Sequence, residues 1–355
     1  MFQETSDPDS LVGEPIVSVI MPVYDHAPYL SDALNSVLGQ ETNFPFEVLI
    51  GDDSSQDRSL EIALAFQREH PGQLRVFATP RNVGMHRNHR NLIMKARAPL
   101  VAYCEGDDFW RSRSKLRRQV EHMMAEPQCA AIHSDFDRIV LRKGRWMVAP
   151  GVNTNMGRNV PSGSVFRELL KGNFVQTCTL LARTKDVQNF LRSELPTESF
   201  PVIDWALCLF LASRGSLKYM PDSTAVYRQV AGSAMNSGNA ARLRTVQGYV
   251  GMIEAVCREF DVPTDDRDAA LFPIRRALLS LSVLASDPSA FKEAHDWLLA
   301  NDSGYLRPMR RRLLPLLVRS PLACKALARI QVFRSWMFRR SFYRLPLDRS
   351  TASSA

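Results

Sequence analysis

The 355-residue sequence lacks the signatures of several protein classes. Its six cysteines form no Cys-x-x-Cys pair, so we expect buried thiols of a reducing compartment rather than disulfides or a zinc site. No stretch approaches the roughly 20 apolar residues that a transmembrane helix needs. The first fifteen residues are acidic and polar, unlike a signal peptide. We therefore expect a cytoplasmic protein, or one that binds peripherally to the cytosolic face of a membrane.

Acidic residues are scarce at the C-terminal end. From residue 301 onward, twelve lysines and arginines stand against only Asp302 and Asp348. This segment is basic enough to account for the whole net charge of +8, and the rest of the chain is close to neutral. A near-neutral body does not indicate a nucleic-acid-binding surface, so we expect no nucleic-acid partner.

Short apolar runs alternate with segments of helical periodicity from residue 16 onward. This alternation predicts an α/β fold with a mostly parallel sheet and crossover helices. The strands that it predicts first are 16–21, 46–50, 74–77 and 100–104. Beyond residue 115 we expect strands at 129–133 and 174–182, a hairpin turn at 142–145, a loop and candidate mobile lid at 151–163, a helix at 202–213 and helices over 240–300.

Unusual residues follow three of the predicted strands. The segments are Pro22-Val23-Tyr24, Asp52-Asp53 and Glu105-Gly106-Asp107-Asp108. Because ligands of open parallel sheets bind beyond the carboxyl ends of the strands, we expect these segments to share one crevice. Clustered carboxylates repel one another unless a cation neutralises them. Mg²⁺ is held by one or two carboxylates together with phosphate oxygens, so a metal–diphosphate ligand would suit this cluster. The alternative is an acidic turn that only caps the next helix, opposite Arg111 and Arg113.

The order and spacing of several motifs carry a family resemblance. The segments VSVIMPVYDHAPYLSDALNSVLGQ, FEVLIGDDSSQD, RNVG, HRN and YCEGDDFW resemble the inverting nucleotide-sugar glycosyltransferases of family 2, which have a GT-A fold. The resemblance is close over 16–120 and looser to about 235, through GNFVQTCTLLAR, PVIDWALCLFLASRG and AVYRQVAGSAMNS. It implies a Rossmann-like GT-A domain over 16–235, with a donor-binding half (16–120) and an acceptor half (121–235). We expect 1–15 to be disordered, 236–300 to form a helical extension and 301–355 to form a basic amphipathic tail.

The resemblance also implies roles in binding the donor. Asp108 would be the direct ligand of Mg²⁺ or Mn²⁺, and Asp107 would share the metal or contact the ribose. Asp53 would accept the imide N–H of uracil or thymine, and Tyr24 would stack on that ring. The complete donor-binding set is Pro22, Val23, Tyr24, Asp52, Asp53, Arg87, Asp107 and Arg228.

A second set of residues is expected on the acceptor side. The resemblance implies that Asp204 is the catalytic base, at the start of an apolar helix where the helix dipole favours the ionised carboxylate. Ile203 stands where the family often has a second acid. Trp205 could stack on a sugar ring. His133 lies at a predicted strand end and is either an acceptor-side residue or a histidine of the core.

One motif departs from the family. Tyr227-Arg228-Gln229 resembles a Tyr-Arg-x-His ending, but no histidine follows until His295. The third metal ligand is therefore unassigned, although Arg228 could contact the diphosphate and 232–239 could form a flap over the donor.

The sequence thus predicts an inverting transfer from a UDP- or dTDP-sugar to a hydroxyl of a saccharide or lipid-linked saccharide, in cell-surface polysaccharide or glycolipid synthesis. A sugar-nucleotide nucleotidyltransferase is disfavoured, because no glycine-rich basic loop follows the first strand. A non-catalytic donor-binding or membrane scaffold protein of the same fold stays open.

The basic tail has a helical pattern of its own. An apolar stripe is formed by Leu322, Ala326, Ile330, Phe333 and Met337. Such a helix can lie in an anionic membrane surface, through residues 307–344, or pack on the body of the protein with a solvated basic face.

Overall fold

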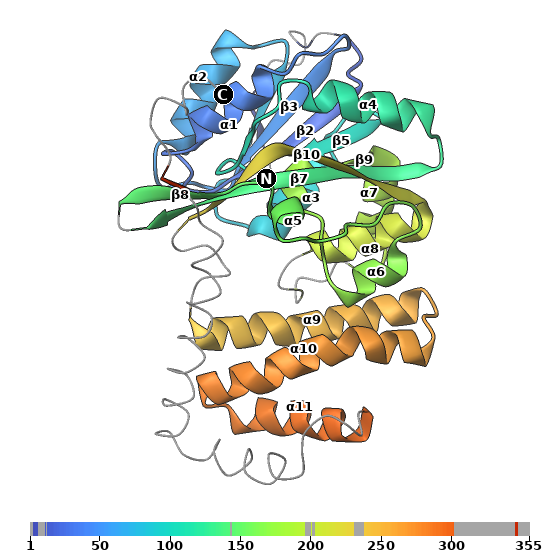
Figure 1. The fold of residues 1–355 in the computed structure, drawn as a ribbon. Coiled ribbons are helices and arrows are strands. Elements are labelled where there is room, and N and C mark those ends of the chain that lie inside the picture. The colour runs from blue at the N-terminus through green and yellow to red at the C-terminus, as the bar shows by residue number, and fades with distance from the viewer. Residues whose placement is uncertain are drawn as a thin grey trace.

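The computed structural model describes residues 3–5, 11, 13–142, 144–195, 200, 203–230, 238–301 and 345–346. Within them the chain forms a mixed, mostly parallel sheet flanked by helices, as predicted (Figure 1). The strands are β1 (Gln3–Glu4), β2 (Val17–Val23), β3 (Phe46–Asp52), β4 (Leu74–Ala78), β5 (Leu100–Tyr103), β6 (Phe109–Trp110), β7 (Cys129–Arg142), β8 (Arg145–Ala149), β9 (Leu181–Arg183), β10 (Ser216–Gln229) and β11 (Leu345–Pro346).

The described helices cover both faces of the sheet and extend beyond it. They are α1 (Leu30–Leu38), α2 (Ser59–Glu69), α3 (Met85–Ile93), α4 (Lys115–Ala125), α5 (Val152–Asn155), α6 (Phe166–Lys171), α7 (Thr184–Arg192), α8 (Asp204–Arg214), α9 (Asn239–Glu259), α10 (Thr264–Ala285) and α11 (Pro288–Asn301). A 3₁₀ turn, η2 (Thr177–Thr179), precedes β9.

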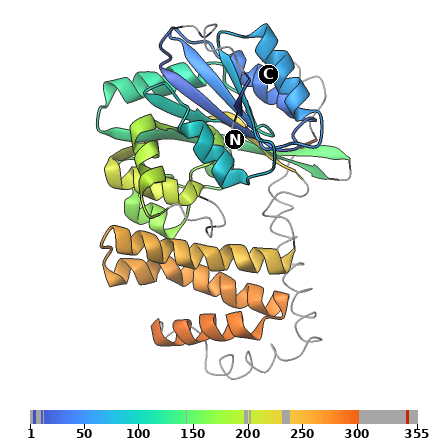
Figure 2. The ribbon, with the colours of Figure 1, turned by 180° about the vertical axis from the view of Figure 1, so that it is seen from behind.

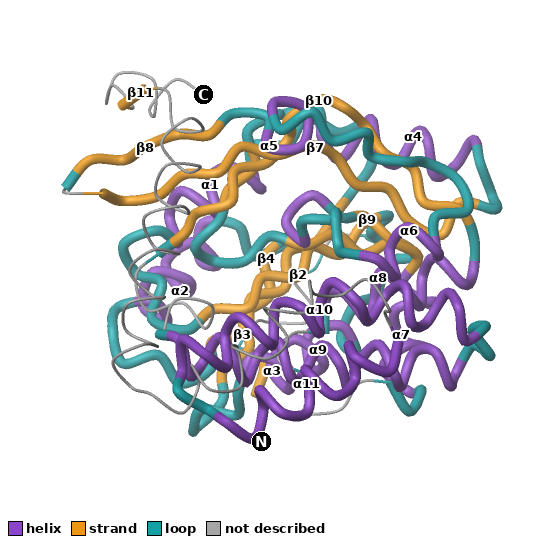
Figure 3. The backbone as a smooth tube through the Cα atoms, turned by 60° about the horizontal axis from the view of Figure 1, so that its bottom comes forward, coloured by secondary structure: helices purple, strands orange, loops and turns teal. Residues whose placement is uncertain are grey.

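The sheet has the strand order β1-β4-β3-β2-β5-β9-β7-β10-β6, with β8 paired to β7 and β11 paired to β8. The segment β4-β3-β2-β5 is parallel, and its crossover connections carry helices, as the sequence predicts. β9 then runs antiparallel to both β5 and β7, whereas β7 and β10 are parallel to each other. Figure 3 shows β7 and β8 continuing together beyond the main sheet as a hairpin.

Successive side chains of the central strands point to opposite faces of the sheet, so buried residues pack on both faces. Figure 2 shows the sheet and its helices from behind. Val17, Val19 and Met21 of β2 belong to one buried cluster with residues of α1, α2 and α4, whereas Ile20 belongs to another cluster with residues of α3. This period of two is what a strand buried on both faces requires, since successive side chains point to opposite sides.

The three C-terminal helices share the core of the sheet domain. Figure 1 shows α9, α10 and α11 stacked beneath α6 and α8. Phe260, which follows α9, packs edge-on against Phe166 of α6 and Phe210 of α8. The apolar residues of these helices belong to the same buried cluster as α3 and α8, so the extension is continuous with the domain rather than separate from it.

Several local predictions need correction. The predicted strand 174–182 is mostly irregular, because η2 interrupts it and only β9 pairs with the sheet. The strand expected at 129–133 continues to Arg142, since β10 pairs with it along its length. The predicted disorder of 1–15 is wrong for Gln3–Glu4, which pair with β4 while Glu4 binds Arg75 at 2.8 Å.

Other expectations concern the proposed lid, the tail helix and the flap. The proposed lid at 151–163 contains α5, and the backbone N–H groups of Asn153 and Thr154 donate to Asp135, while its mobility stays a prediction. The amphipathic tail helix and most of the expected flap lie outside the described residues. In the described part of the chain, no helix is long and apolar enough to cross a membrane.

Cavity creation in the extension tests the shared core. Ile253 of α9 is fully buried, so Ile253→Ala should lower the free energy of unfolding by about 3 kcal/mol. Met94→Ala is the control, because Met94 is 44% exposed and its loss should cost less than about 0.5 kcal/mol. Denaturant unfolding should show one transition that moves as a unit. Two transitions, with only one displaced, would show that the extension folds independently.

Candidate active site

The three unusual strand ends meet through the backbone at the exit of β2. The Pro22 carbonyl accepts a hydrogen bond from the Gly106 N–H at 3.2 Å, and the Val23 carbonyl accepts one from the Asp53 N–H at 2.9 Å. β2 therefore holds both acidic segments, one on each side. The parallel topology predicts that these three strand ends lie together.

Gly106 allows the acidic turn to lie against β2. A Cβ atom at this position would stand 2.8 Å from Nδ1 of His26 and 2.9 Å from Cγ2 of Val23. Real Cβ atoms do not approach other atoms so closely, so any side chain here would force either the turn or the side chains of His26 and Val23 to move. The spacing of the carboxylates in Glu105-Gly106-Asp107-Asp108 therefore depends on this glycine.

The acidic turn concentrates negative charge in a poorly solvated place. Burial, together with the charges of Asp107 and Glu105, raises the pKa of Asp108 well above its usual range. Burial also raises the pKa of Glu105 to about 7, with a further contribution from Asp107. Glu105 Oε2 is buried and has no hydrogen-bond partner, whereas the Asp107 side chain is half-exposed. Such a cluster favours a bound cation, because a positive charge would stabilise the ionised form of every member.

The carboxylates fit a divalent cation that a ligand helps to hold. Among the described residues, no group of three or more His, Cys, Asp or Glu side chains is arranged as a complete metal site. Mg²⁺ and Mn²⁺ favour oxygen ligands, and sites of this kind are often completed by phosphate oxygens. The turn therefore supplies carboxylate oxygens for a metal ion, and the phosphate oxygens of a ligand would complete its coordination.

Arg228 fixes the acidic turn from the end of β10. Its backbone N–H donates to Asp108 Oδ1 at 2.8 Å, and its Nη1 donates to the Asp107 carbonyl at 2.9 Å. Nη2 forms an ion pair at 3.1 Å with Asp32 of α1. The guanidinium also lies over three rings, those of Tyr29, Phe109 and Trp146. Arg228 is therefore buried and engaged within the protein, where it joins the turn, α1 and the β7–β8 hairpin.

Asp52, the last residue of β3, and Asp53, which follows it, have different surroundings. Both carboxylate oxygens of Asp53 accept hydrogen bonds, from the N–H groups of Val83 at 2.7 Å and Gly84 at 2.9 Å. Asp53 thus holds the turn that begins α3. Asp52 accepts a bond from the Ser55 N–H through Oδ2, but its Oδ1 is buried and has no partner. The buried carboxylate oxygen without a partner at this strand end is therefore Oδ1 of Asp52, whereas each oxygen of Asp53 accepts at least one hydrogen bond.

Asp204 is the first residue of α8 and lies beside the acidic turn. The negative charge of Asp204 contributes to the raised pKa of Glu105, so the two carboxylates are neighbours. Burial raises the pKa of Asp204 itself, while the Trp205 N–H and the charge of His86 oppose that rise. A buried carboxylate whose pKa is raised is a stronger base than a solvated one.

The remaining predicted site residues are spread over different environments. Trp205 lies in the core: it is 7% exposed, and its Nε1 donates to the Leu169 carbonyl at 2.8 Å. Its ring therefore packs on protein and is not presented to a sugar. His133 is also buried, between the rings of Phe174 and Tyr219, which agrees with the core alternative.

Three of the residues expected to bind the donor stand at the exit of β2. Val23 is buried, Pro22 is half-buried and Tyr24 is exposed. Arg87 is exposed on α3. Its neighbour Asn88 points inward and donates to the Gly51 carbonyl at 2.7 Å, which draws α3 onto β3.

Sequence reasoning missed two residues near Asp204. His86 of α3 and Tyr249 of α9 both interact with its carboxylate. Nothing in the sequence marked Tyr249, because it belongs to a helical extension without a motif. His86 stands in the HRN segment, in which the family resemblance points to Arg87.

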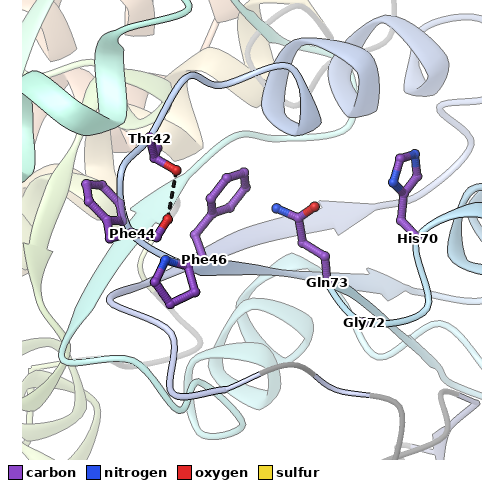
Figure 4. A pocket seen from close by; sticks show the side chains of 7 residues that line it. Thr42, Phe44, Phe46, His70, Gly72 and Gln73 are labelled. Carbon is purple, nitrogen blue, oxygen red and sulfur yellow. Dashed lines mark hydrogen bonds between the residues drawn. The ribbon is translucent and has the colours of Figure 1, made fainter.

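A separate pocket lies at the opposite end of the sheet (Figure 4). It has a volume of about 320 Å³ and is lined by residues that precede or begin β3 and β4: Thr42, Phe44, Pro45, Phe46, His70, Gly72 and Gln73. Because β3 runs from Phe46 to Asp52, this pocket and the acidic residues occupy opposite ends of the strand.

The chain matches the family Glycosyl transferase family 2 over residues 18–186. The uncharacterised protein Rv1520 of Mycobacterium tuberculosis is 28% identical over 64% of this chain and 62% of that protein. The chain thus spans less than two thirds of the length of this relative. TuaG of Bacillus subtilis, named as a glycosyltransferase of teichuronic acid biosynthesis, is 26% identical over 64% of this chain and 85% of its own.

Solved structures share the same architecture. TarS of S. aureus, residues 1–349 in complex with UDP, has a TM-score of 0.55 and 19% identity, and covers 90% of this chain and 91% of its own. The mannosyltransferase PcManGT of Pyrobaculum calidifontis, in complex with GDP-Man and Mn²⁺, has a TM-score of 0.54 and 19% identity, and covers 96% of this chain and 88% of its own.

Fold and motifs together define a glycosyltransferase domain of the GT-A class. Residues 18–186 match glycosyltransferase family 2, the family that the sequence motifs resemble.

A single methyl group tests how the turn is held. Gly106→Ala should displace the acidic carboxylates from the exit of β2, because the new Cβ would overlap His26 and Val23. We expect at least tenfold weaker Mn²⁺-dependent binding of nucleoside diphosphates, measured by calorimetry. Gly251→Ala in α9 is the control, since a Cβ there meets nothing within 4 Å and alanine favours a helix. Equal binding by both variants would show that the close approach is dispensable.

Proposed function

We propose that the protein transfers a sugar from a nucleotide-sugar donor to an acceptor hydroxyl, with inversion at the anomeric carbon. The observation that carries this proposal is the proximity of two unlike acidic groups. The acidic turn from Glu105 to Asp108 would bind a cation. It lies beside the separate buried carboxylate of Asp204. The acidic turn, with its cation, would bind the diphosphate leaving group. Asp204 would take the proton of the acceptor hydroxyl.

The donor would lie across the exits of β2, β3 and β5. Asp107 and Asp108 would hold Mg²⁺ or Mn²⁺, which supplies neutralisation of the charge on the departing diphosphate. Asp53, or the unpaired Oδ1 of Asp52, would accept the imide N–H of a uracil or thymine ring, and the exposed Tyr24 ring would stack on that base. Pro22 and Val23 shape the exit, and Arg87 would contact the diphosphate side. Arg228 would act by holding the turn in place.

Asp204 would act as the general base for the acceptor. It accepts the hydroxyl proton while the acceptor oxygen attacks the anomeric carbon from the face opposite the nucleotide. A direct displacement of this kind inverts the configuration. The raised pKa of Asp204 suits the task, provided that the group is ionised when the acceptor binds.

The donor class and pathway are inferred from relatives. Solved TarS structures contain UDP and UDP-GlcNAc, and TuaG is named for teichuronic acid biosynthesis, so we favour a UDP- or dTDP-sugar and a surface polysaccharide or lipid-linked saccharide acceptor. The proposed setting is the cytoplasm, at the cytosolic face of the membrane, with the basic segment 307–344 toward anionic lipids.

Asp204→Asn separates catalysis from binding. Asparagine keeps the size of the side chain but cannot accept the proton, so turnover should fall by about 10²–10⁴-fold while donor affinity stays within about twofold. The measurement is sugar transfer or donor hydrolysis over a panel of nucleotide-sugars, together with calorimetric donor binding. Asp296→Asn, at an exposed site on α11, is the control.

The same variant tests the alternative that the protein binds the donor without catalysis. The missing histidine after Gln229 supports this alternative. If Asp204→Asn preserves function in cells, the base assignment is wrong and the scaffold function is favoured. No turnover by the unaltered protein with any nucleotide-sugar would also contradict the proposed reaction.

A further inference from the structure

The loop between β2 and α1 is held by side chains of the segment that leads into α2. Three consecutive backbone N–H groups of this loop, at 25–27, donate to side chains of residues 55–59. The bonds run from Asp25 to Ser55 Oγ at 3.0 Å, from His26 to Ser59 Oγ at 2.8 Å and from Ala27 to Asp57 Oδ2 at 2.9 Å. A further bond runs in the opposite direction, from the Gln56 N–H to Asp25 Oδ1 at 2.7 Å. Hydrogen bonds in both directions therefore join the two segments.

Both joined loops contain a residue with a left-handed backbone conformation. Asp25 has a φ of 56° and Ser54 has a φ of 62°, so two of the four described residues other than glycine with a positive φ lie here. A residue with a Cβ adopts this conformation at a cost, and it persists where surrounding contacts impose it. The bonds at Asp25, Ser55 and Gln56 lie directly beside both residues. The fold thus maintains two strained turns at the edge of the candidate donor site.

These loops flank the place proposed for the nucleobase. Tyr24, which would stack on the base, follows β2 directly and is 44% exposed. The register of the parallel strands places Val23 opposite Asp52, and the Val23 carbonyl accepts a hydrogen bond from the Asp53 N–H. The strands thus fix the two aspartates, whereas the position of Tyr24 depends also on how the loop after it is held.

Asp57 connects the start of α2 to the loop after β2, with one carboxylate oxygen for each. Oδ1 accepts hydrogen bonds from the Ser59 N–H at 2.9 Å and from the Ser59 hydroxyl at 2.5 Å, and Oδ2 accepts the bond from Ala27. The Ser59 oxygen that Asp57 orients in turn accepts the His26 N–H. Although desolvation acts to raise the pKa of Asp57, the hydrogen bonds with Ser59 and Ala27 lower it overall. The carboxylate is therefore ionised at neutral pH, and hydrogen bonds to an ionised acceptor are the stronger kind.

We propose that Asp57 is a positioning residue for the nucleobase part of the donor site: it holds the loop after β2 and so fixes Tyr24 relative to Asp52 and Asp53. The inference rests on the proposed function, which places the base against Tyr24. The acidic turn has restraints of its own, since Gly106 is bonded to Pro22 and the Asp107 carbonyl to Arg228. Binding of the diphosphate should therefore not depend on Asp57.

Asp57→Asn is the informative substitution. Asparagine begins helices as well as aspartate does, so its one oxygen can still serve Ser59, but its NH₂ group cannot accept the Ala27 N–H. Calorimetry with Mn²⁺ would compare pyrophosphate with the tightest-binding of UDP, dTDP and GDP. We expect about tenfold weaker nucleotide binding, for the loss of one hydrogen bond to a charged group, and pyrophosphate binding within about twofold. Glu61→Gln is the matched control, because this exposed carboxylate of α2 pairs with Arg58 at 2.7 Å and lies outside both loops.

A double-mutant cycle with Tyr24→Ala shows whether Asp57 acts through that ring. If it does, Asp57→Asn should weaken nucleotide binding by less than about twofold once the ring is gone, because the two changes remove the same interaction. A merely structural role would lower nucleotide and pyrophosphate affinity alike, and equally in both backgrounds. That result, or unchanged nucleotide affinity in Asp57→Asn, would overturn the inference and leave the proposed reaction intact. Failure of the unaltered protein to bind any of the three nucleotides would contradict the proposed function itself, and the inference with it.

Discussion

Confinement of three carboxylates at the end of β5 is the constraint on which the rest of the site depends. The backbone bond from Gly106 to Pro22 and the absence of a Cβ at Gly106 press the turn against β2. Arg228 then fixes it from β10 through the Asp108 carboxylate and the Asp107 carbonyl. The fold stabilises the position of these acids but not their charge, because burial disfavours ionised groups. The structure therefore favours the binding of a cation and of the anionic ligand that accompanies it.

The same constraint explains how distant parts of the chain reach one site. Parallel pairing of β2, β3 and β5 places their carboxyl ends together, and Asp53 holds the turn that starts α3. That helix carries His86 toward Asp204. The extension approaches from below, since Tyr249 of α9 packs against Trp205. Asp204 is therefore surrounded by residues of α3, of the acidic turn and of α9, which are distant from one another in sequence.

Much of the fold could be predicted from the sequence, because the first four strands are apolar runs at regular spacing and the motifs stand at their ends. Tertiary pairing could not. β7 continues to Arg142 only because β10 runs beside it, and Gln3–Glu4 are ordered by Arg75. At the site, the acidic turn was recognisable as a cluster of like charges. The burial of Trp205 and the free oxygen of Asp52 depend on neighbours from remote segments, and no local pattern shows them.

Calorimetry can establish whether a metal ion and a diphosphate complete the acidic turn. UDP, dTDP and GDP would be titrated with Mn²⁺ and with a chelator, on the unaltered protein and on Asp108→Asn. The variant keeps an oxygen for the Arg228 N–H but loses the charge. We expect metal-dependent binding of at least one nucleotide, strongest for UDP or dTDP, and its loss in the variant. Binding that is equally tight with the chelator, or unchanged by Asp108→Asn, would contradict it.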